Sequence, residues 1–312
     1  MTRIFVTILF AGTALAQVSG PVLGYLPVGG TLRTMYGIPA SGAIGPLMRA
    51  GRGFSKAVAS PSGSFALAST ESGAVAALSP ADGESLRAAI IPDAMAGDIH
   101  FSPNGSAALI ASGGRLQVIG GLPAFPAVIR TLDVSFLGGA SALAASDDGQ
   151  WVAGVFGGLV YALGSSSQVI ALPAPAGVTA LTFFHGTGDL AVTTASQIAK
   201  ISELGGSPAV STIFGSSNGP APPESPMALA LTSDNGRIVL LEPDGGIGQV
   251  DLKNGAISTA KCGCTPQGLF GLGGSVFRLS GLSGGSVKVY DAASGNVWFV
   301  PLALAGAEGG RR

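Results

Sequence analysis

The chain has 312 residues, with 16 Lys or Arg against 17 Asp or Glu, so its formal charge is −1. Charged residues make up only 11% of the chain, whereas about 25% is usual in soluble domains. This balance excludes the basic surface that a nucleic-acid binder or an anionic-membrane binder needs. The 50 glycines favour a protein of many short strands and tight turns.

Residues 1–16 have the pattern of a secretory signal peptide. Arg3 gives a positive start, Ile4 begins an apolar run, and the small residues Ala14 and Ala16 precede Gln17. The apolar run is shorter than the ~20 residues that span a bilayer as a helix. We therefore expect cleavage after Ala16, a secreted or periplasmic location, and no transmembrane span in the mature chain.

Residues 17–46 are predicted to form a pair of strands ahead of the repeats. The expected strands, 22–26 and 31–38, flank a turn at 27–30 that contains Pro27 and two glycines. This pair could be the outer part of an incomplete repeat, or it could close a ring of repeats.

Residues 47–301 contain a repeated phrase of an apolar strand, a turn of the form Ser-x-x-Gly and a second apolar strand. Asp, Asn and Ser in such a turn bond to their own backbone, and Gly accepts a positive φ. The spacing of about forty residues is typical of a four-stranded propeller blade. The turns reach their glycine clearly at Gly63, Gly105, Gly149 and Gly236, and in weaker copies at Gly188 and Gly274.

The predicted fold is therefore an all-β β-propeller with four-stranded antiparallel blades. Six units are complete, and the strand pair at 17–46 could supply part of another, so we favour seven blades over six. A parallel β-helix is the less favoured alternative, because it does not need a hairpin turn in each copy. Residues 302–312 are expected to be a flexible C-terminal tail.

Three phrases carry a resemblance to a known family: Ser60-Pro61-Ser62-Gly63, Ser102-Pro103-Asn104-Gly105 and Val287-Lys288-Val289-Tyr290-Asp291. They resemble the secreted bacterial β-propellers of the WD-like or YVTN repeat type, over about residues 54–301. The resemblance implies the architecture and leaves the activity open, because propellers include enzymes, binding modules and scaffolds.

The two histidines, His100 and His185, are too few for a zinc site, which usually has three or four protein ligands. Asp98 precedes His100 by two residues, so a carboxylate–imidazole pair on one strand face is conceivable. The simpler interpretation is a strand histidine bonded to neighbouring backbone. The two Gly-x-Ser-x-Gly matches, at 215–219 and 281–285, lack the strand and helix of a nucleophile elbow. We predict no catalytic residue, no metal site and no cofactor.

Cys262 and Cys264 are the only cysteines and are separated by a single glycine. In an exported protein they could form a disulfide within this loop, remain two free thiols, or supply half of an intermolecular metal site. The disulfide is the favoured interpretation.

Candidate binding residues follow from the expected geometry of a propeller. Loops between blades share a face with the loops between second and third strands, opposite the Ser-x-x-Gly turns, and loops held by a rigid scaffold often carry function. Solvation of loop tips would explain the same charges. The residues predicted for this ligand-binding face, besides the cysteine pair, are Arg49, Arg52, Asp93, Asp98, Arg115, Glu224, Glu242, Asp244 and Lys261.

Together these features predict a secreted, non-catalytic propeller that acts as a binding or structural module. Its partner would be an unknown protein or a small-molecule ligand, and not a nucleic acid. The alternative is a propeller enzyme of the hydrolase or lactonase type. Such an enzyme should gather acids, histidines or arginines on one face, which the sparse charge disfavours.

Overall fold

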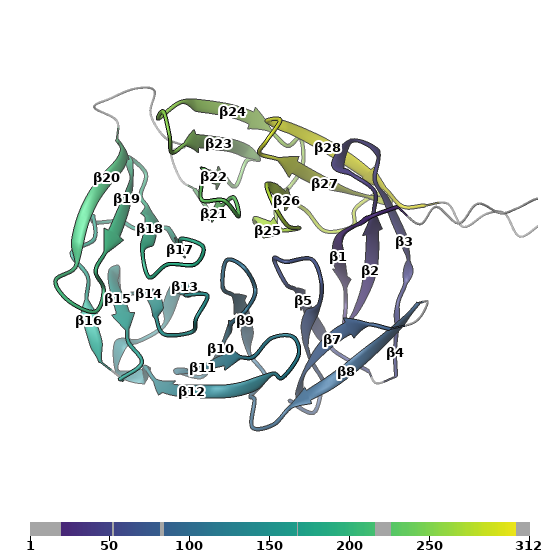
Figure 1. Ribbon diagram of the computed structural model, residues 1–312, viewed down its shortest axis with the longest axis horizontal. Coiled ribbons are helices and arrows are strands. Elements are labelled where there is room, and N and C mark those ends of the chain that lie inside the picture. The colour runs from purple at the N-terminus through teal and green to yellow at the C-terminus, as the bar shows by residue number, and fades with distance from the viewer. Residues whose placement is uncertain (1–19, 52, 82–83, 167, 216–225, 304–312) are drawn as a thin grey trace, which may run out of the picture.

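The computed structural model describes residues 20–51, 53–81, 84–166, 168–215 and 226–303. Antiparallel sheets are arranged around a central axis as seven blades, with β5, β9, β13, β17, β21 and β25 nearest the axis (Figure 1). The prediction of an all-β propeller, and the preference for seven blades, are confirmed.

Each blade follows the chain in order from its inner strand to its outer strand. Blade 1 contains β1 (Val22–Val28), β2 (Thr31–Tyr36) and β3 (Ala43–Leu47); blade 2 contains β5 (Lys56–Ala59), β6 (Ala66–Ser69), β7 (Val75–Pro80) and β8 (Ser85–Ile91), with β4 (Arg49–Ala50) beside β8; blade 3 contains β9 (Asp98–Phe101), β10 (Ala108–Ser112), β11 (Arg115–Gly120) and β12 (Ala127–Asp133); blade 4 contains β13 (Ala140–Ala145), β14 (Val152–Phe156), β15 (Leu159–Leu163) and β16 (Val169–Ala171); blade 5 contains β17 (Ala180–Phe183), β18 (Leu190–Thr193), β19 (Gln197–Ser202) and β20 (Ala209–Gly215); blade 6 contains β21 (Ala228–Leu231), β22 (Arg237–Leu241), β23 (Gly246–Asp251) and β24 (Ile257–Lys261); blade 7 contains β25 (Phe270–Gly271), β26 (Val276–Arg278), β27 (Ser286–Asp291) and β28 (Asn296–Pro301). Two short 3-10 turns, η1 (Pro39–Ser41) and η2 (Ser135–Leu137), lie in the connections.

The burial of a strand depends on its place in the blade. β14, a second strand, is buried along its whole length, because both of its faces pack against neighbouring blades. The outer strand β12 alternates between exposed and less exposed positions, because only one of its faces meets a neighbour. Continuous apolar runs therefore mark the middle strands, and alternating runs mark the outer ones.

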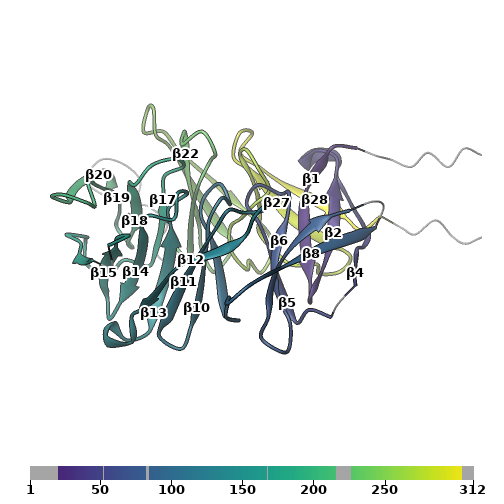
Figure 2. The same cartoon turned by 60° about the horizontal axis from the view of Figure 1, so that its bottom comes forward.

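Seven clusters of buried apolar side chains form the core of the described chain, one in each interface between adjacent blades. The cluster between blades 4 and 5, for example, joins Ala153 and Val155 to Phe183 and Leu190. Blade-to-blade packing thus replaces a single central core, and the axis itself is left to the inner strands (Figures 1 and 2).

The Ser-x-x-Gly turns lie together on one face of the ring, which we call the turn rim. The carboxylate of Asp147, in the turn of blade 4, accepts the backbone N–H of Asn104 at 2.9 Å and that of Gly186 at 2.8 Å, from the turns of blades 3 and 5. His185 donates its backbone N–H to Asn235 Oδ1 at 2.8 Å, and Asn235 Nδ2 donates to the His185 carbonyl at 2.9 Å. These bonds link the turns of blades 3, 4, 5 and 6 in series.

The left-handed residue of the turn is not always the last glycine of the motif. Gly63, Gly105 and Gly149 have φ of 67°, 79° and 66°, as the motif predicts for its last residue. In blade 6 the left-handed residue is Asn235, at φ 54°, rather than the following glycine. In blade 5 it is Gly186, at φ 69°. Asn and Gly are the residues that adopt this conformation most readily, so the repeat tolerates the shift.

Blade 1 has three strands in the described chain and lacks the strand nearest the axis. β1 begins beside the turn rim, where a Cβ on Gly63 would lie 3.3 Å from Gly24 Cα. The β1–β2 turn lies at the opposite face, where a Cβ on Gly30 would overlap the Phe54 carbonyl group ahead of β5. β1 therefore runs in the direction of a second strand. Leu302 closes the ring by a parallel bridge to Ile44 of β3.

Candidate functional site

The face opposite the turn rim carries the connections between blades, and we call it the loop face. A cleft of about 490 Å³ lies on it between blades 2, 3 and 4. Its polar lining includes Lys56, Asp98, His100, Ser112, Arg115 and Ser141. This loop-face cleft brings together two of the predicted residues, Asp98 and Arg115, and also contains His100, which the sequence analysis considered as a partner of Asp98. Lys56 also lines it and was not predicted.

Asp98 and Lys56 form an ion pair between two inner strands. Lys56 begins β5 and Asp98 begins β9, so the strand starts of neighbouring blades place the two side chains together. Lys56 Nζ lies 2.7 Å from Asp98 Oδ1, with about half of the lysine side chain exposed (50%). This hydrogen bond, and the charge of Lys56, hold the pKa of Asp98 below its ordinary value. Asp98 is therefore an ionised acceptor at neutral pH.

His100 follows Asp98 by two residues on the same strand and lies deeper in the wall of the cleft. Burial lowers the pKa of its imidazole, and the opposing effect of the nearby Asp98 carboxylate is smaller. The ring is consequently neutral at pH 7 and offers one donor and one acceptor nitrogen.

Arg115 lies at the edge of the cleft, at the start of β11. A two-residue turn of Gly113 and Gly114, with φ of 55° and 80°, directs the chain into this strand. Across the sheet from Arg115 is Asp133, whose carboxylate accepts the Ser135 hydroxyl at 2.6 Å and the Ser135 N–H at 3.0 Å. The pKa of Asp133 is lowered mainly by these two hydrogen bonds, and to a smaller extent by the charge of Arg115.

Three predicted residues belong to a separate group on blade 6. Lys261 Nζ lies 3.4 Å from Asp244 Oδ2, and Asp244 Oδ1 accepts the Gly246 N–H at 2.9 Å. The bond from Gly246 is the main cause of the lowered pKa of Asp244. Glu242 precedes this turn, and its backbone N–H bonds to the Gly246 carbonyl at 2.8 Å. None of the three side chains lines the loop-face cleft.

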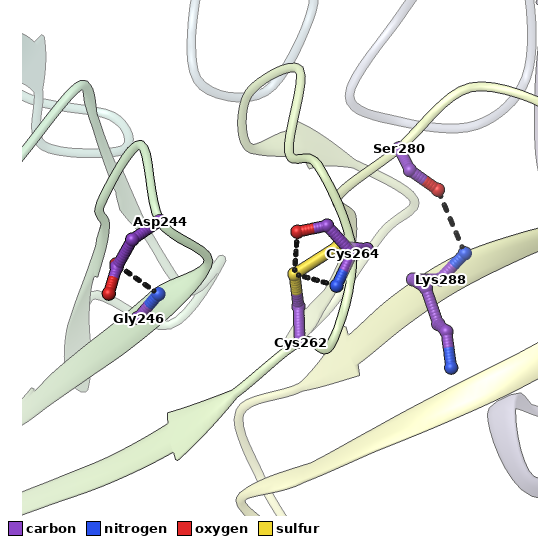
Figure 3. The surroundings of a disulfide bond; sticks show 6 residues. All are labelled: Asp244, Gly246, Cys262, Cys264, Ser280 and Lys288. Atoms are coloured by element: carbon purple, nitrogen blue, oxygen red, sulfur yellow. Dashed lines mark hydrogen bonds between the residues drawn. A yellow bond between two sulfur atoms is a disulfide. The ribbon is translucent and has the colours of Figure 1, made fainter.

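The cysteine pair lies next to this group and is joined by a disulfide, with Cα atoms 5.2 Å apart (Figure 3). Cys262 is buried, and its Sγ accepts the Cys264 N–H at 3.1 Å. A Cβ on Gly245 would lie 2.7 Å from Cys262 Sγ, so the disulfide packs directly against the β22–β23 turn. The disulfide thus fixes the connection from blade 6 to blade 7.

The remaining predicted residues are distributed elsewhere. Asp93 adopts a left-handed conformation at φ 60° in the connection from blade 2 to blade 3, where its carbonyl accepts Gln117 Nε2 at 2.9 Å. Arg49 lies in β4 at the outer edge, away from the cleft, and pairs with the start of β8. Arg52 and Glu224 lie outside the described residues.

Sequence reasoning missed a second cavity of about 490 Å³, which lies on the axis and which we call the axial cavity. Inner strands from six blades form its walls, and residues of the turn rim form its mouth. The same apolar residue types line this cavity and fill the blade interfaces, so the pattern alone does not distinguish them. Its lining includes Val58, Phe101, Leu181, Leu229, Phe270 and both histidines.

A buried arginine beside the axial cavity was also missed. Arg278 is 6% exposed, and its guanidinium lies 4.0 Å from the ring centroid of Phe270. Its Nη1 donates to the Ser280 carbonyl at 2.8 Å, while its Nε has no hydrogen-bond acceptor among the described residues. Burial lowers the pKa of Arg278 to about 10, so the group remains charged at neutral pH.

Within the described residues, no three His, Cys, Asp or Glu side chains gather as a metal site. No helix there has the length and apolar character needed to cross a bilayer.

Comparison with known proteins supports the architecture. No family model matches the chain. No curated protein matches it either. A functionally unknown protein from Desulfotomaculum acetoxidans DSM 771 has a similar structure, with a TM-score of 0.57 and 11% identity over 90% of this chain and 100% of the other. A candidate 6-phosphogluconolactonase from Bacteroides uniformis ATCC 8492 has a TM-score of 0.54 and 15% identity, over 89% and 95% of the two chains. At such identities the similarity shows the fold alone.

Proposed function

We propose that this protein is a secreted or periplasmic, non-catalytic binding module that takes a small polar ligand with an anionic group in the loop-face cleft. The observation that carries the proposal is the convergence of Lys56, Arg115 and Asp98 on one cleft. Two cations and one carboxylate favour a ligand with a net negative charge, whether or not it also carries a positive group. The location rests on the signal-like residues 1–16, which lie outside the described residues.

The charge states in the cleft support recognition more than proton transfer. Lys56 lowers the pKa of Asp98, whereas a carboxyl that acts as a general acid needs a raised pKa. Burial lowers the pKa of His100, so the imidazole stays neutral across the neutral range. Lys56 and Asp98 carry constant charges, and the neutral imidazole of His100 lies deeper in the cleft. Together they offer a ligand hydrogen-bond donors and acceptors that do not change near neutral pH.

The test is calorimetric titration of the mature chain with three sets of probes: small carboxylates, phosphate monoesters and amino acids. Arg115→Gln should weaken the binding of any anionic probe that binds by about tenfold or more, because a charge-assisted hydrogen bond is lost. Arg87→Gln is the matched control, since Arg87 is exposed on the outer strand β8. An equal loss in both variants, or no loss in Arg115→Gln, would contradict a site in the cleft.

A lactonase-like enzyme is the second candidate, because Asp98 and His100 occupy positions i and i+2 of β9 and one similar structure is a candidate 6-phosphogluconolactonase. The discriminating assay is hydrolysis of 6-phosphogluconolactone by the wild type and by His100→Gln. Hydrolysis by the wild type that is lost in His100→Gln would show that the protein is an enzyme and would contradict the non-catalytic binding module. The absence of turnover above the spontaneous rate is the result that the binding module predicts.

A further inference from the structure

The axial cavity differs in chemistry from the loop-face cleft. Residues of β5, β9, β13, β17, β21 and β25 line it, and no Asp, Glu, Lys or Arg of the described chain is among them. The lining is instead uncharged and mainly apolar, with aromatic rings from Phe101, Phe270 and Phe277. Such a composition, with few polar groups, is usual for small-molecule sites of about 300–1,000 Å³.

Two of the aromatic rings in the wall, Phe101 and Phe270, are packed against side chains outside the cavity lining. Phe101 makes an edge-to-face contact with Phe65, with ring centroids 5.6 Å apart and planes at 84°. Phe270 carries the Arg278 guanidinium on one face, 4.0 Å from its centroid. Rings that are already fixed lose little conformational entropy when a ligand packs against them.

The polar side chains in the wall are the imidazoles of His100 and His185 and the hydroxyl of Thr182. Burial lowers the pKa of His100, which favours its neutral form. His185 Nε2 lies 3.4 Å from the Leu231 carbonyl, and its backbone is bonded in both directions to Asn235. Each ring can supply a hydrogen bond at a defined place in a mainly apolar surface.

The mouth of the cavity is built from the turn rim, so it is a rigid opening. Ser62, Asn104 and Ser233 lie at this mouth. The hydrogen bonds that Asp147 and Asn235 make across the rim connect the turns around it. Ser233 continues the series by donating its N–H to the Gly274 carbonyl of blade 7 at 3.0 Å.

We propose that the axial cavity is a second binding site, which takes an uncharged aromatic small molecule with one hydrogen-bonding group. The aromatic body packs among Phe101, Phe270 and Phe277, and the polar group bonds to the imidazole of His100 or His185. A charged ligand would have to lose its hydration without an opposite charge in the wall, which is costly. The axial cavity adjoins the loop-face cleft, sharing Ile99, His100 and Leu143 with it, but contains none of the charged residues of that cleft.

The test uses N-phenyl-1-naphthylamine, a neutral aromatic amine with one N–H whose fluorescence rises in apolar surroundings. The wild type should bind one molecule per chain with saturation. Ala230→Phe, which places a ring in the cavity from β21, should weaken binding at least tenfold. Ala209→Phe is the control, because Ala209 is exposed on the outer strand β20 and should leave binding unchanged. Melting temperatures are measured for each variant, and Ala59→Leu, in the wall from β5, replaces Ala230→Phe if that variant unfolds.

The charge requirement is tested with 1-anilinonaphthalene-8-sulfonate, which has the same skeleton and an added sulfonate. It should bind at least tenfold more weakly than the neutral amine. Tighter binding of the sulfonate, abolished by Arg278→Met, would overturn the proposal in favour of an anion site at Arg278. Absence of saturable binding of the amine, or equal binding by Ala230→Phe, would also overturn it. Arg115→Gln should not affect the amine, so this result is independent of the loop-face cleft.

Discussion

Single residues on the turn rim connect blades that are distant in sequence. The two carboxylate oxygens of Asp147 accept hydrogen bonds from the backbone N–H groups of Asn104 and Gly186, in the turns of the two neighbouring blades. The motif could place Asp147 in a turn. The motif could not show which backbone groups the Asp147 carboxylate would bond to, because those partners depend on how the blades are arranged around the axis.

We predict that Asp147→Ala lowers the free energy of unfolding by about 2–3 kcal/mol, since two backbone N–H groups lose a charged acceptor. Urea denaturation followed by circular dichroism measures the change. Glu71→Ala is the control, an exposed residue in the β6–β7 turn, and should stay within about 0.5 kcal/mol. A loss in Asp147→Ala no larger than in this control would show that the rim bonds contribute little.

His100 gives stability a dependence on pH with a defined sign. Burial lowers the folded-state pKa of the imidazole below the ordinary 6.5, so the unfolded chain binds a proton more readily than the folded one. Stability from this residue is therefore present above the unfolded pKa and is lost as the pH falls below it.

The expected result is that the unfolding free energy of the wild type decreases from pH 7 to pH 5 more steeply than that of His100→Gln. The difference in slope should not exceed about 1.4 kcal/mol per pH unit, the value for one proton. Asp98 does not contribute in this window, because its pKa is lowered from an ordinary 3.8. Parallel pH profiles of the two proteins would refute a buried neutral imidazole.

At the scale of the element, the turn chemistry predicted where the hairpins lie. The Ser-x-x-Gly phrase located the first hairpin of blades 2, 3 and 4, where Ser60, Ser102 and Ser146 begin turns that end on a left-handed glycine. β3 and β4 were not expected as strands. β3 contains Gly45 and Pro46, residues that disfavour strands in sequence-based reasoning, and it forms because it pairs with β2.

Turn glycines with a positive φ fall into two groups. Some are required only because other residues are strained at that φ, and others also because a neighbouring atom occupies the place of a Cβ. Gly255, at φ 69°, has open space around it, whereas a Cβ on Gly105, at φ 79°, would overlap the Ser60 hydroxyl of the preceding blade. Gly255→Ala should therefore cost about 1–2 kcal/mol from φ strain alone. Gly105→Ala should cost measurably more, because Ser60 must also move. Thermal unfolding of the two variants provides the comparison, and equal losses would show that Ser60 moves freely.

At the scale of the molecule, the architecture was more predictable than the site. Repeats at a blade period specify a propeller because each unit can bury its faces only against its neighbours. Two of the predicted residues, Asp98 and Arg115, line one cleft on the loop face, and the same cleft also contains Lys56 from an adjacent blade, which was not predicted. The axial cavity was not predictable from these patterns, because its volume depends on how far six inner strands stand from the axis.

Closure of the ring depends on the two ends of the described chain. Six of the seven blade interfaces join blades that are consecutive in sequence, whereas blade 7 meets blade 1 through Val287, Val289 and Val300 packed against Leu26 and Ile44. One backbone bond crosses this interface, from the Ala303 N–H to the Ile44 carbonyl at 2.8 Å, and within blade 7 the Leu302 N–H bonds to the Gly285 carbonyl at 2.6 Å.

We therefore predict that a chain ending after Ala303 unfolds at the same urea concentration as the full chain. A chain ending after Pro301 should lose about 2–4 kcal/mol, because two backbone hydrogen bonds and the partly buried Leu302 side chain are removed. The loss should be larger than for Leu302→Ala in the full chain, which keeps both hydrogen bonds. Because the Ala303–Ile44 bond joins the last blade to β3 of the first blade, hydrogen exchange in the shorter chain should rise first in β3 and β28. Equal stability of the two truncated chains would show that apolar packing alone holds the ring closed.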